Sequence, residues 1–200
     1  LGAAVRRPRP DVAKGHPEHS PALAEASADG TGALYVNPFA NPANPLAHET
    51  TTAPEIWAQM DQDLDAVVCG VGSGGTLTGI GRFMKTHAPH VEMVLADPEG
   101  SILAETVATG VAPSAVGSWL VEGIGEDFIP LNCDLSLVSA AFTIPDAEAF
   151  ATAREVLLKE GFIVGSSSGT LIGAALRYCR AQSAPKRVVT FVPDSGNKYL

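Results

Sequence analysis

The sequence predicts an α/β fold in which a parallel sheet lies between two layers of helices. From Ala33 onward, short β-branched runs alternate with longer segments of helical periodicity, which is typical of βαβ units. With 200 residues, 46% of them hydrophobic, the chain can bury one sizeable core. We therefore expect one main unit over residues 33–200. Residues 1–32 are polar and rich in Pro and Gly, so we expect loop there with a short helix near residues 22–28.

The expected strands are short runs of β-branched residues, and the expected helices repeat their apolar positions at steps of three and four. The strands should cover residues 34–36, 66–69, 93–96, 138–143 and 188–191. The helices should cover residues 53–59, 77–87, 146–160 and 170–182. Pro145 followed by Asp146 is a good helix start, and we expect the apolar face of that helix, from Ala149 to Leu157, to pack on the sheet.

Composition and charge exclude several classes of protein. The formal net charge is −9, and no run of Lys or Arg forms a stripe that follows a phosphate backbone, so nucleic acid is not an expected partner. Cys69, Cys133 and Cys179 lie far apart, and the histidines lack ligand spacing, so neither a disulfide framework nor a metal site is expected. The longest apolar runs fall far short of the ~20 residues that cross a bilayer. We expect a cytoplasmic protein without a membrane partner.

A glycine-rich loop from Gly70 to Thr76 follows the expected strand at residues 66–69 and precedes a helix. Glycines let the backbone turn tightly and approach a ligand, while the free N–H groups and the dipole of a helix N-terminus attract a phosphate. A turn without any ligand is the simplest alternative. Two ligands also compete. Gly70, Gly72 and Gly75 fit a dinucleotide fingerprint, with Asp97 ~20 residues later as the ribose-binding acid. Alternatively, residues 72–76 form a cup for one phosphate monoester, to which the Thr76 hydroxyl adds a donor.

Six short segments taken together decide between these ligands. They are Asn-Pro-Ala-Asn-Pro-Leu-Ala-His at 41–48, Gly-Ser-Gly-Gly-Thr at 72–76, Ala-Asp-Pro-Glu-Gly-Ser at 96–101, Val-Glu-Gly-Ile-Gly-Glu-Asp-Phe at 121–128, Gly-Ser-Ser-Ser-Gly at 165–169 and Pro-Asp-Ser at 193–195. In this order and spacing they resemble the pyridoxal-phosphate-dependent cysteine synthase and cystathionine β-synthase family. The resemblance covers residues 41–200 and makes Asp97 an ordinary strand-end residue.

The resemblance implies a tryptophan synthase β-like fold whose N-terminal part is missing here. Residues 1–32 would finish the smaller, mobile domain, and residues 33–200 would form most of the large cofactor-binding domain. The intact enzyme is expected to be a homodimer that acts on small amino-acid and thiol substrates.

The resemblance also assigns roles to residues. The cofactor phosphate would be bound by Gly72, Ser73, Gly74, Gly75 and Thr76. The ring nitrogen of pyridoxal 5′-phosphate would be bound by Ser167, whose hydroxyl makes the ring a milder electron sink than an aspartate would. The alternative interpretation is that Ser166 to Ser168 cap the helix that follows, and the two roles are compatible.

Gly123 and Gly125 resemble a family loop in which missing side chains leave room for the substrate amino acid. An ordinary turn is the alternative interpretation.

Two departures from the family pattern matter. Pro38 stands where relatives carry a Gln that holds the substrate carboxylate. The family's Schiff-base lysine is expected upstream of everything in this chain, and the lysines present are expected to be surface charges; they are Lys14, Lys85, Lys159, Lys186 and Lys198. We therefore expect the chain alone to be inactive.

The string from Glu122 to Phe128 looks more like that of cystathionine β-synthases, which join serine and homocysteine, than like that of cysteine synthases, which use O-acetylserine and sulfide. Both reactions stay open, as do a truncated paralogue without catalysis, suggested by Pro38, and an oxidoreductase domain that binds NAD.

Overall fold

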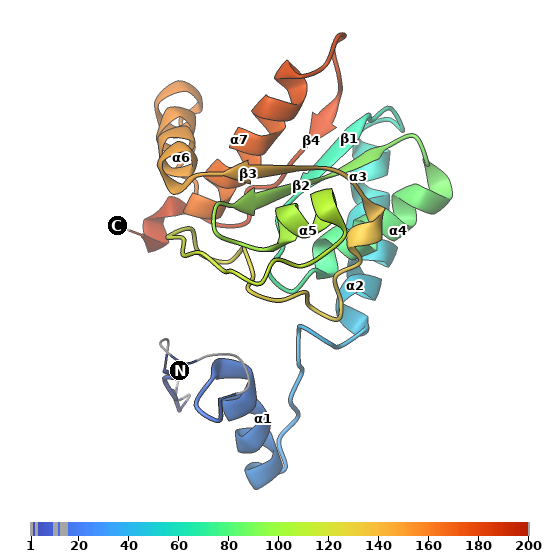
Figure 1. The fold of residues 1–200 in the computed structure, drawn as a ribbon. Coiled ribbons are helices and arrows are strands. Elements are labelled where there is room, and N and C mark those ends of the chain that lie inside the picture. The colour runs from blue at the N-terminus through green and yellow to red at the C-terminus, as the bar shows by residue number, and fades with distance from the viewer. Residues whose placement is uncertain (1, 3, 10–11, 13–15, 200) are drawn as a thin grey trace.

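A computed structural model describes residues 2, 4–9, 12 and 16–199 (Figure 1). Its centre is a parallel four-stranded sheet in the order β3-β2-β1-β4. The strands are β1 (Ala66–Cys69), β2 (Glu92–Pro98), β3 (Val138–Ile144) and β4 (Val188–Val189). Because β1 has a neighbour on each side, its residues are all buried, and the loop that follows it opens at the carboxyl edge of the sheet.

Helices cover both faces of the sheet, as the predicted three-layer arrangement requires. The longer helices are α1 (Ser20–Thr31), α3 (Ala53–Gln59), α4 (Gly75–His87), α5 (Leu103–Thr109), α6 (Asp146–Glu160) and α7 (Ser166–Arg180). The short ones are α2 (Ala43–Ala47), the π-helix η1 (His48–Thr52) and the 3₁₀ turns η2 (Leu135–Leu137) and η3 (Gly196–Lys198).

Alternate residues of the central strands feed two separate cores, because side chains of a strand alternate between the faces of a sheet. Val67 of β1 joins a core with Leu77 and Ile80 of α4, whereas Val68 joins a second core with Leu171 of α7. The sheet is therefore buried on both faces, which explains the nearly continuous apolar runs of β1 and β2.

The predicted elements are mostly confirmed, with several corrections. The strand expected at residues 188–191 covers only Val188–Val189. Residues 34–36 form no strand; no neighbouring strand pairs with them, and Leu34 is 88% exposed. The helix α6 packs on α7 rather than on the sheet, and Phe150 and Leu157 on its expected inner face remain substantially exposed. The segments α2, η1 and α5 were not predicted, and α7 begins at Ser166, four residues earlier than expected.

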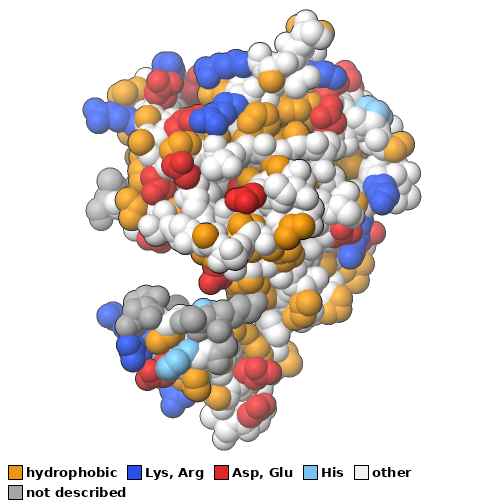
Figure 2. Space-filling model, in the orientation of Figure 1, with side chains coloured by type: hydrophobic (Ala, Val, Ile, Leu, Met, Phe, Trp, Pro, Cys, Tyr) orange, Lys and Arg blue, Asp and Glu red, His pale blue; other side chains and the backbone are white. Residues whose placement is uncertain are grey.

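The segment that carries α1 stands apart from the sheet and is joined to it by an extended stretch near residues 33–42 (Figure 1). The hydrogen bonds described for its side chains stay within it, as between Arg6 Nη1 and Ser27 Oγ at 2.7 Å. On the face shown in Figure 2, Lys and Arg side chains are scattered among acidic ones and form no basic stripe.

Among the described residues, no helix combines the length and apolar character needed to cross a bilayer. The same residues contain no group of three or more His, Cys, Asp or Glu side chains that could hold a metal ion.

Candidate functional site

The loop between β1 and α4 presents a row of free backbone donors. Within the described part of the chain, none of the N–H groups from Gly72 to Leu77 donates a hydrogen bond. The first donor that does is the amide of Thr78, which reaches the Gly74 carbonyl at 3.0 Å. Unpaired amides at the start of a 13-residue helix, where the helix dipole is positive, form a site for an anion.

The glycines of this loop are required because the protein packs closely behind it. A Cβ at Gly72 would lie 2.6 Å from the carbonyl oxygen of Gly123, and one at Gly75 would overlap the side-chain amide of Asn44. Gly74 has a φ of 83° and would direct a Cβ against Cys133 at 2.5 Å. The neighbouring segments therefore support the loop from behind, and its amides remain free on the other side.

The two hydroxyl-bearing residues of the loop are each held by the same helical segment, α2 and η1. Asn44 Nδ2 donates to Ser73 Oγ at 2.9 Å, and also to the Pro38 carbonyl at 2.8 Å. His48 Nε2 lies 3.2 Å from Thr76 Oγ1. Burial lowers the pKa of His48, which favours its neutral ring.

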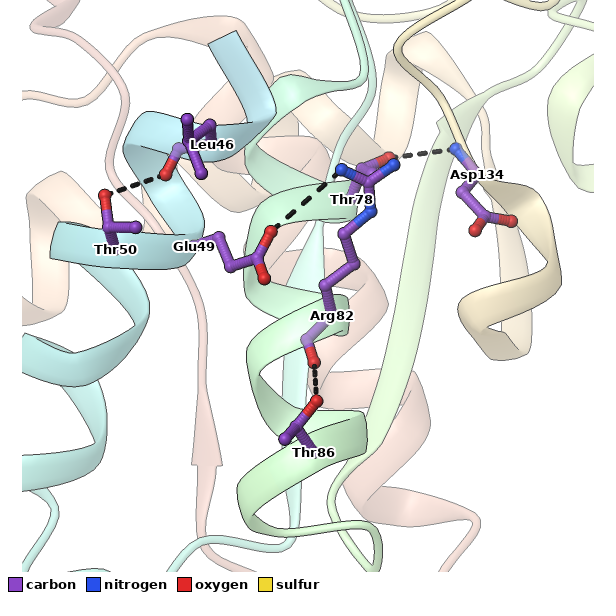
Figure 3. A network of polar contacts seen from close by, with 7 residues as sticks. All are labelled: Leu46, Glu49, Thr50, Thr78, Arg82, Thr86 and Asp134. Carbon is purple, nitrogen blue, oxygen red and sulfur yellow. Dashed lines mark hydrogen bonds and ion pairs between the residues drawn. The ribbon is translucent and has the colours of Figure 1, made fainter. Parts of the chain in front are cut away.

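Figure 3 shows how this segment is fastened to α4 and how α4 is fastened to the loop before β3. The carboxylate of Glu49 pairs with Arg82 of α4 at 4.0 Å. On the other side of the helix, the amide of Asp134 donates to Thr78 Oγ1 at 2.9 Å. These contacts hold α4 from two sides, at Thr78 in its first turn and at Arg82 farther along.

The loop at residues 121–125 is hydrogen-bonded both to the glycine loop and to the start of α7. The amide of Gly125 donates to the Val71 carbonyl at 2.9 Å, while the amide of Glu122 donates to Ser166 Oγ at 3.3 Å. Gly123 and Gly125 both have positive φ, 84° and 88°, and a Cβ at Gly123 would meet nothing within 4 Å. The structure thus places three segments with predicted site residues side by side, and it leaves space at Gly123.

The serines of α7 do not cap their helix. Gly165 is the N-cap and makes no side-chain cap bond, and Ser166 to Ser168 lie inside the helix, so the capping interpretation of these serines is wrong. Ser167 is only 4% exposed, and its hydroxyl has no hydrogen-bond partner among the described residues. Ser168 is fully buried, and its hydroxyl is also unpaired there. The fully buried hydroxyl without a partner in this turn is therefore that of Ser168, and the role of Ser167 toward a ligand atom stays a prediction from the resemblance.

Asp97 is not placed to bind a ribose. It is fully buried at the end of β2, where its Oδ2 accepts the amide of Ala104 in the first turn of α5 at 2.8 Å. Burial raises the pKa of this carboxyl group. The geometry agrees with a strand-end residue that fixes α5, as the resemblance implied.

Pro38 offers no side-chain donor, and its carbonyl is already used. It accepts the side-chain amides of Asn44 and Asn132, each at 2.8 Å. Pro38 is therefore held close to the glycine loop through Asn44, at a position that lacks the amide expected from relatives.

The four described lysines lie at the surface. Lys159 pairs with Glu155, Lys186 with Asp65 at the start of β1, and Lys198 with Asp194. Lys85 is exposed in the last turn of α4, at the opposite end of that helix from the glycine loop. Lys14 lies outside the described residues. Surface positions agree with the expectation for these four side chains.

Sequence reasoning assigned His48 a structural role but did not foresee its contact with Thr76, and it missed Asn44, Thr52, Asn132 and Cys133. Their contacts arise through tertiary packing, and spacing along the chain does not show such contacts. One signal was present: Asn44 and His48 are four residues apart, which places them on one face of a helix.

The arrangement can hold a phosphate group and, beyond it, a small ring and an amino acid. Within the described residues, the amides from Gly72 to Leu77 are unpaired, and a Cβ at Gly123 would meet nothing within 4 Å. The loop itself carries no charged side chain from Gly72 to Leu77, so an anion bound there would be held by backbone dipoles and neutral donors.

A family model described as "Pyridoxal-phosphate dependent enzyme" matches residues 1–194. Among curated relatives, the cystathionine beta-synthase of Apis mellifera is 35% identical over the whole of this chain and 39% of its own length. The cysteine synthase A of Escherichia coli K12 is 40% identical over 84% of this chain and 52% of its own length. The chain thus spans about half the length of the curated relatives it matches, or less.

A crystal structure of an O-ureido-L-serine synthase has the same arrangement. The two superpose with a TM-score of 0.80 at 30% sequence identity, over 89% of this chain and 54% of the other.

Proposed function

The chain belongs to the family of pyridoxal-phosphate-dependent enzymes, and we propose that it forms the phosphate-binding and ring-binding side of a β-replacement site. The observation that carries the proposal is the row of unpaired amides from Gly72 to Leu77 at the start of α4. Membership of this family removes the dinucleotide interpretation of the loop, in agreement with the buried position of Asp97.

In this proposal the phosphate of pyridoxal 5′-phosphate is bound by Gly72, Ser73, Gly74, Gly75 and Thr76. Ser167 donates to the ring nitrogen, and Gly123 leaves room for the substrate amino acid. Gly125 does not fit the predicted role, because a Cβ there would lie 2.8 Å from the Trp119 ring, so its missing side chain accommodates that ring instead. When bound, the cofactor supplies an electron sink for the substrate. The chain's own residues orient it: the amides fix one end, and a neutral hydroxyl fixes the ring without holding its nitrogen protonated as a carboxylate would.

The reaction we propose is β-replacement on serine or an activated serine by a thiol or sulfide. The cystathionine β-synthase reaction is favoured by the string from Glu122 to Phe128. Cysteine synthase is the second candidate, because the cysteine synthase A of Escherichia coli is as similar to the chain as the cystathionine synthases are. Pro38 predicts that carboxylate recognition differs from that of relatives with Gln at this position.

We further propose that the lysine which attaches the cofactor is none of the four described here. Each is exposed, and three of them pair with carboxylates at the surface. The assignment of residues 1–32 to a smaller domain, a homodimeric state and a cytoplasmic location remain predictions from the resemblance.

The test introduces a carboxylate into the cup. Ser73→Asp should weaken binding of inorganic phosphate and of pyridoxal 5′-phosphate at least about tenfold, because the new carboxylate would repel a phosphate bound in the same loop. The fold should be retained, since an acidic side chain beside a helix N-terminus is favourable. Binding is measured by calorimetric titration, and folding by the melting temperature.

The matched control is Ser183→Asp, which adds the same charge in an exposed turn after α7. It should leave both affinities unchanged. Equal affinities in the two variants, or equal losses, would refute the assignment of the cup.

A further inference from the structure

Three side chains form a chain of contacts that ends at the glycine loop. Thr52 Oγ1 lies 3.0 Å from His48 Nδ1, and His48 Nε2 lies 3.2 Å from Thr76 Oγ1. All three are half-buried, and burial lowers the pKa of His48, so the ring between the two hydroxyls is favoured in its neutral form. A neutral ring carries its proton on one nitrogen only, and the hydrogen bond at the other nitrogen selects which.

Neighbouring threonines show that Thr52 uses its hydroxyl differently. Thr50 and Thr51 donate to the carbonyls of Leu46 and Ala47, four residues earlier, at 2.9 and 2.6 Å. Within the described residues, Thr52 instead contacts the imidazole of His48, the residue four positions before it. The Nδ1 atom of that ring is therefore the polar atom that the Thr52 hydroxyl contacts.

The backbone holds His48 in place for this contact. Residues 48–52 form a π-helical turn, in which the amide of Ala53 bonds to the His48 carbonyl. The turn lies directly against α4, where a Cβ at Gly79 would come within 2.6 Å of the His48 Cβ. Because Gly79 lacks that atom, the ring can reach Thr76 one turn earlier on the same helix.

We propose that His48 is a positioning residue for the cofactor phosphate. The Thr52 hydroxyl donates to Nδ1, so the ring proton lies on Nε2, and Nε2 donates to Thr76 Oγ1. The Thr76 hydroxyl proton is then free to point to a phosphate oxygen. The inference rests on the proposed function of the Gly72 to Leu77 loop.

The opposite arrangement loses a donor to the anion. If Nδ1 carried the proton, Nε2 would accept the Thr76 hydroxyl proton, and Thr76 would present only lone pairs to the phosphate. A hydrogen bond to a charged phosphate is stronger than one to a neutral imidazole. Bound phosphate therefore favours the same tautomer that Thr52 selects.

The first test determines the tautomer in the 200-residue chain by long-range ¹H–¹⁵N correlation spectra of labelled histidine at pH 7.5. The His48 signals are assigned by their loss in His48→Gln. We expect a protonated Nε2 and a bare Nδ1, both without ligand and with inorganic phosphate. In Thr52→Val, which keeps the shape of the side chain but removes its donor, the ligand-free ring should become a mixture of tautomers.

The second test measures the affinities for inorganic phosphate and pyridoxal 5′-phosphate. His48→Leu should weaken both about fivefold, the scale of one neutral hydrogen bond, because Thr76 keeps its hydroxyl but loses the donor that orients it. His48→Gln, whose amide can donate from nearly the position of Nε2, should restore most of this loss. Thr76→Val removes the hydrogen bond to the charged phosphate itself and should weaken both at least about tenfold, and the double variant should be no worse than Thr76→Val alone. The control is His87→Leu, an exposed histidine in the last turn of α4, which should change neither affinity.

The results separate this inference from the proposed function. If the wild-type chain binds neither probe, the proposed function fails and this inference fails with it. If the wild type binds but His48 carries its proton on Nδ1, or the two losses add in the double variant, only the role of His48 is overturned.

Discussion

Ser167 and Ser168 are adjacent in the first turn of α7 and predict different effects of the same substitution. Ser167→Ala should weaken binding of pyridoxal 5′-phosphate about fivefold, since one neutral hydrogen bond contributes ~1 kcal/mol, and should leave the affinity for inorganic phosphate unchanged. Ser168→Ala removes a buried hydroxyl without a partner and should raise the free energy of unfolding by about 1 kcal/mol. Calorimetric titration and urea unfolding measure the two quantities.

Ser168→Ala also serves as the control for Ser167→Ala in the titrations. A weaker affinity for both ligands in Ser167→Ala would show that this serine supports the phosphate loop rather than the ring.

A residue's role could be predicted where it depends on neighbours in the sequence, but not where it depends on tertiary contacts. Gly72 to Thr76 could be predicted as an anion site because a strand, glycines and a helix start follow one another in the sequence. His48 and Asn44 could not, since their contacts to the loop arise only when η1 packs against α4. The capping of α7 by serines was predicted wrongly because the extended Gly165 takes the N-cap position.

Gly79 of α4 and Gly173 of α7 are both buried in helices, but alanine should have opposite effects on stability at the two positions. A Cβ at Gly79 of α4 would overlap the Pro45 carbonyl and lie 2.8 Å from the amide of Glu49, so Gly79→Ala should destabilise the fold by about 1–3 kcal/mol. At Gly173 of α7 the nearest atoms are 3.6 Å away, which is an ordinary contact. Gly173→Ala should therefore stabilise the fold by about 0.5–1 kcal/mol, the usual preference of a helix for alanine.

Urea unfolding of the two variants beside the wild type measures both effects. A neutral or stabilising Gly79→Ala would mean that η1 does not lie as close to α4 as described. In that case the contact between His48 and Thr76 would lose its structural basis as well.

Strong periodicity and clear start signals located whole helices, and residues 53–59 and 146–160 agree with the structure to the residue. The α2 and η1 segment was missed because Pro42, Pro45 and a run of threonines are poor helix formers, and packing against α4 overrides that preference. Residues 34–36 read as a strand by composition, but a strand needs a neighbour to pair with, and composition does not show whether one exists. The inward face of α6 was misassigned because periodicity does not say whether a helix or a sheet covers it.

On the scale of the whole molecule, we have proposed a cofactor site to which none of the four described lysines attaches the cofactor. After mixing with pyridoxal 5′-phosphate and reduction with borohydride, we expect scattered, substoichiometric labelling of exposed lysines and no cystathionine or cysteine formation. Peptide mass mapping locates the label, and chromatography with serine or O-acetylserine and a thiol detects product. Stoichiometric labelling of one lysine together with product would overturn the proposal that none of the described lysines is catalytic.

The three-layer arrangement of one sheet between two helical layers could be predicted as a whole, because the alternation of strands and helices restricts a parallel fold to few arrangements. The separate position of α1 could not, since its polar segment contains no signal for what it should pack against. The separation of the two parts is visible only in the assembled structure (Figure 1).

The most direct test of the phosphate site follows backbone amide signals of the ¹⁵N-labelled chain during titration with pyridoxal 5′-phosphate. We expect the signals from Gly72 to Leu77 to shift first and most, followed by those of Gly123 and Ser167. Inorganic phosphate should shift only the signals from Gly72 to Leu77. Shifts confined to other surfaces, with the Gly72 to Leu77 amides unmoved at saturation, would contradict it.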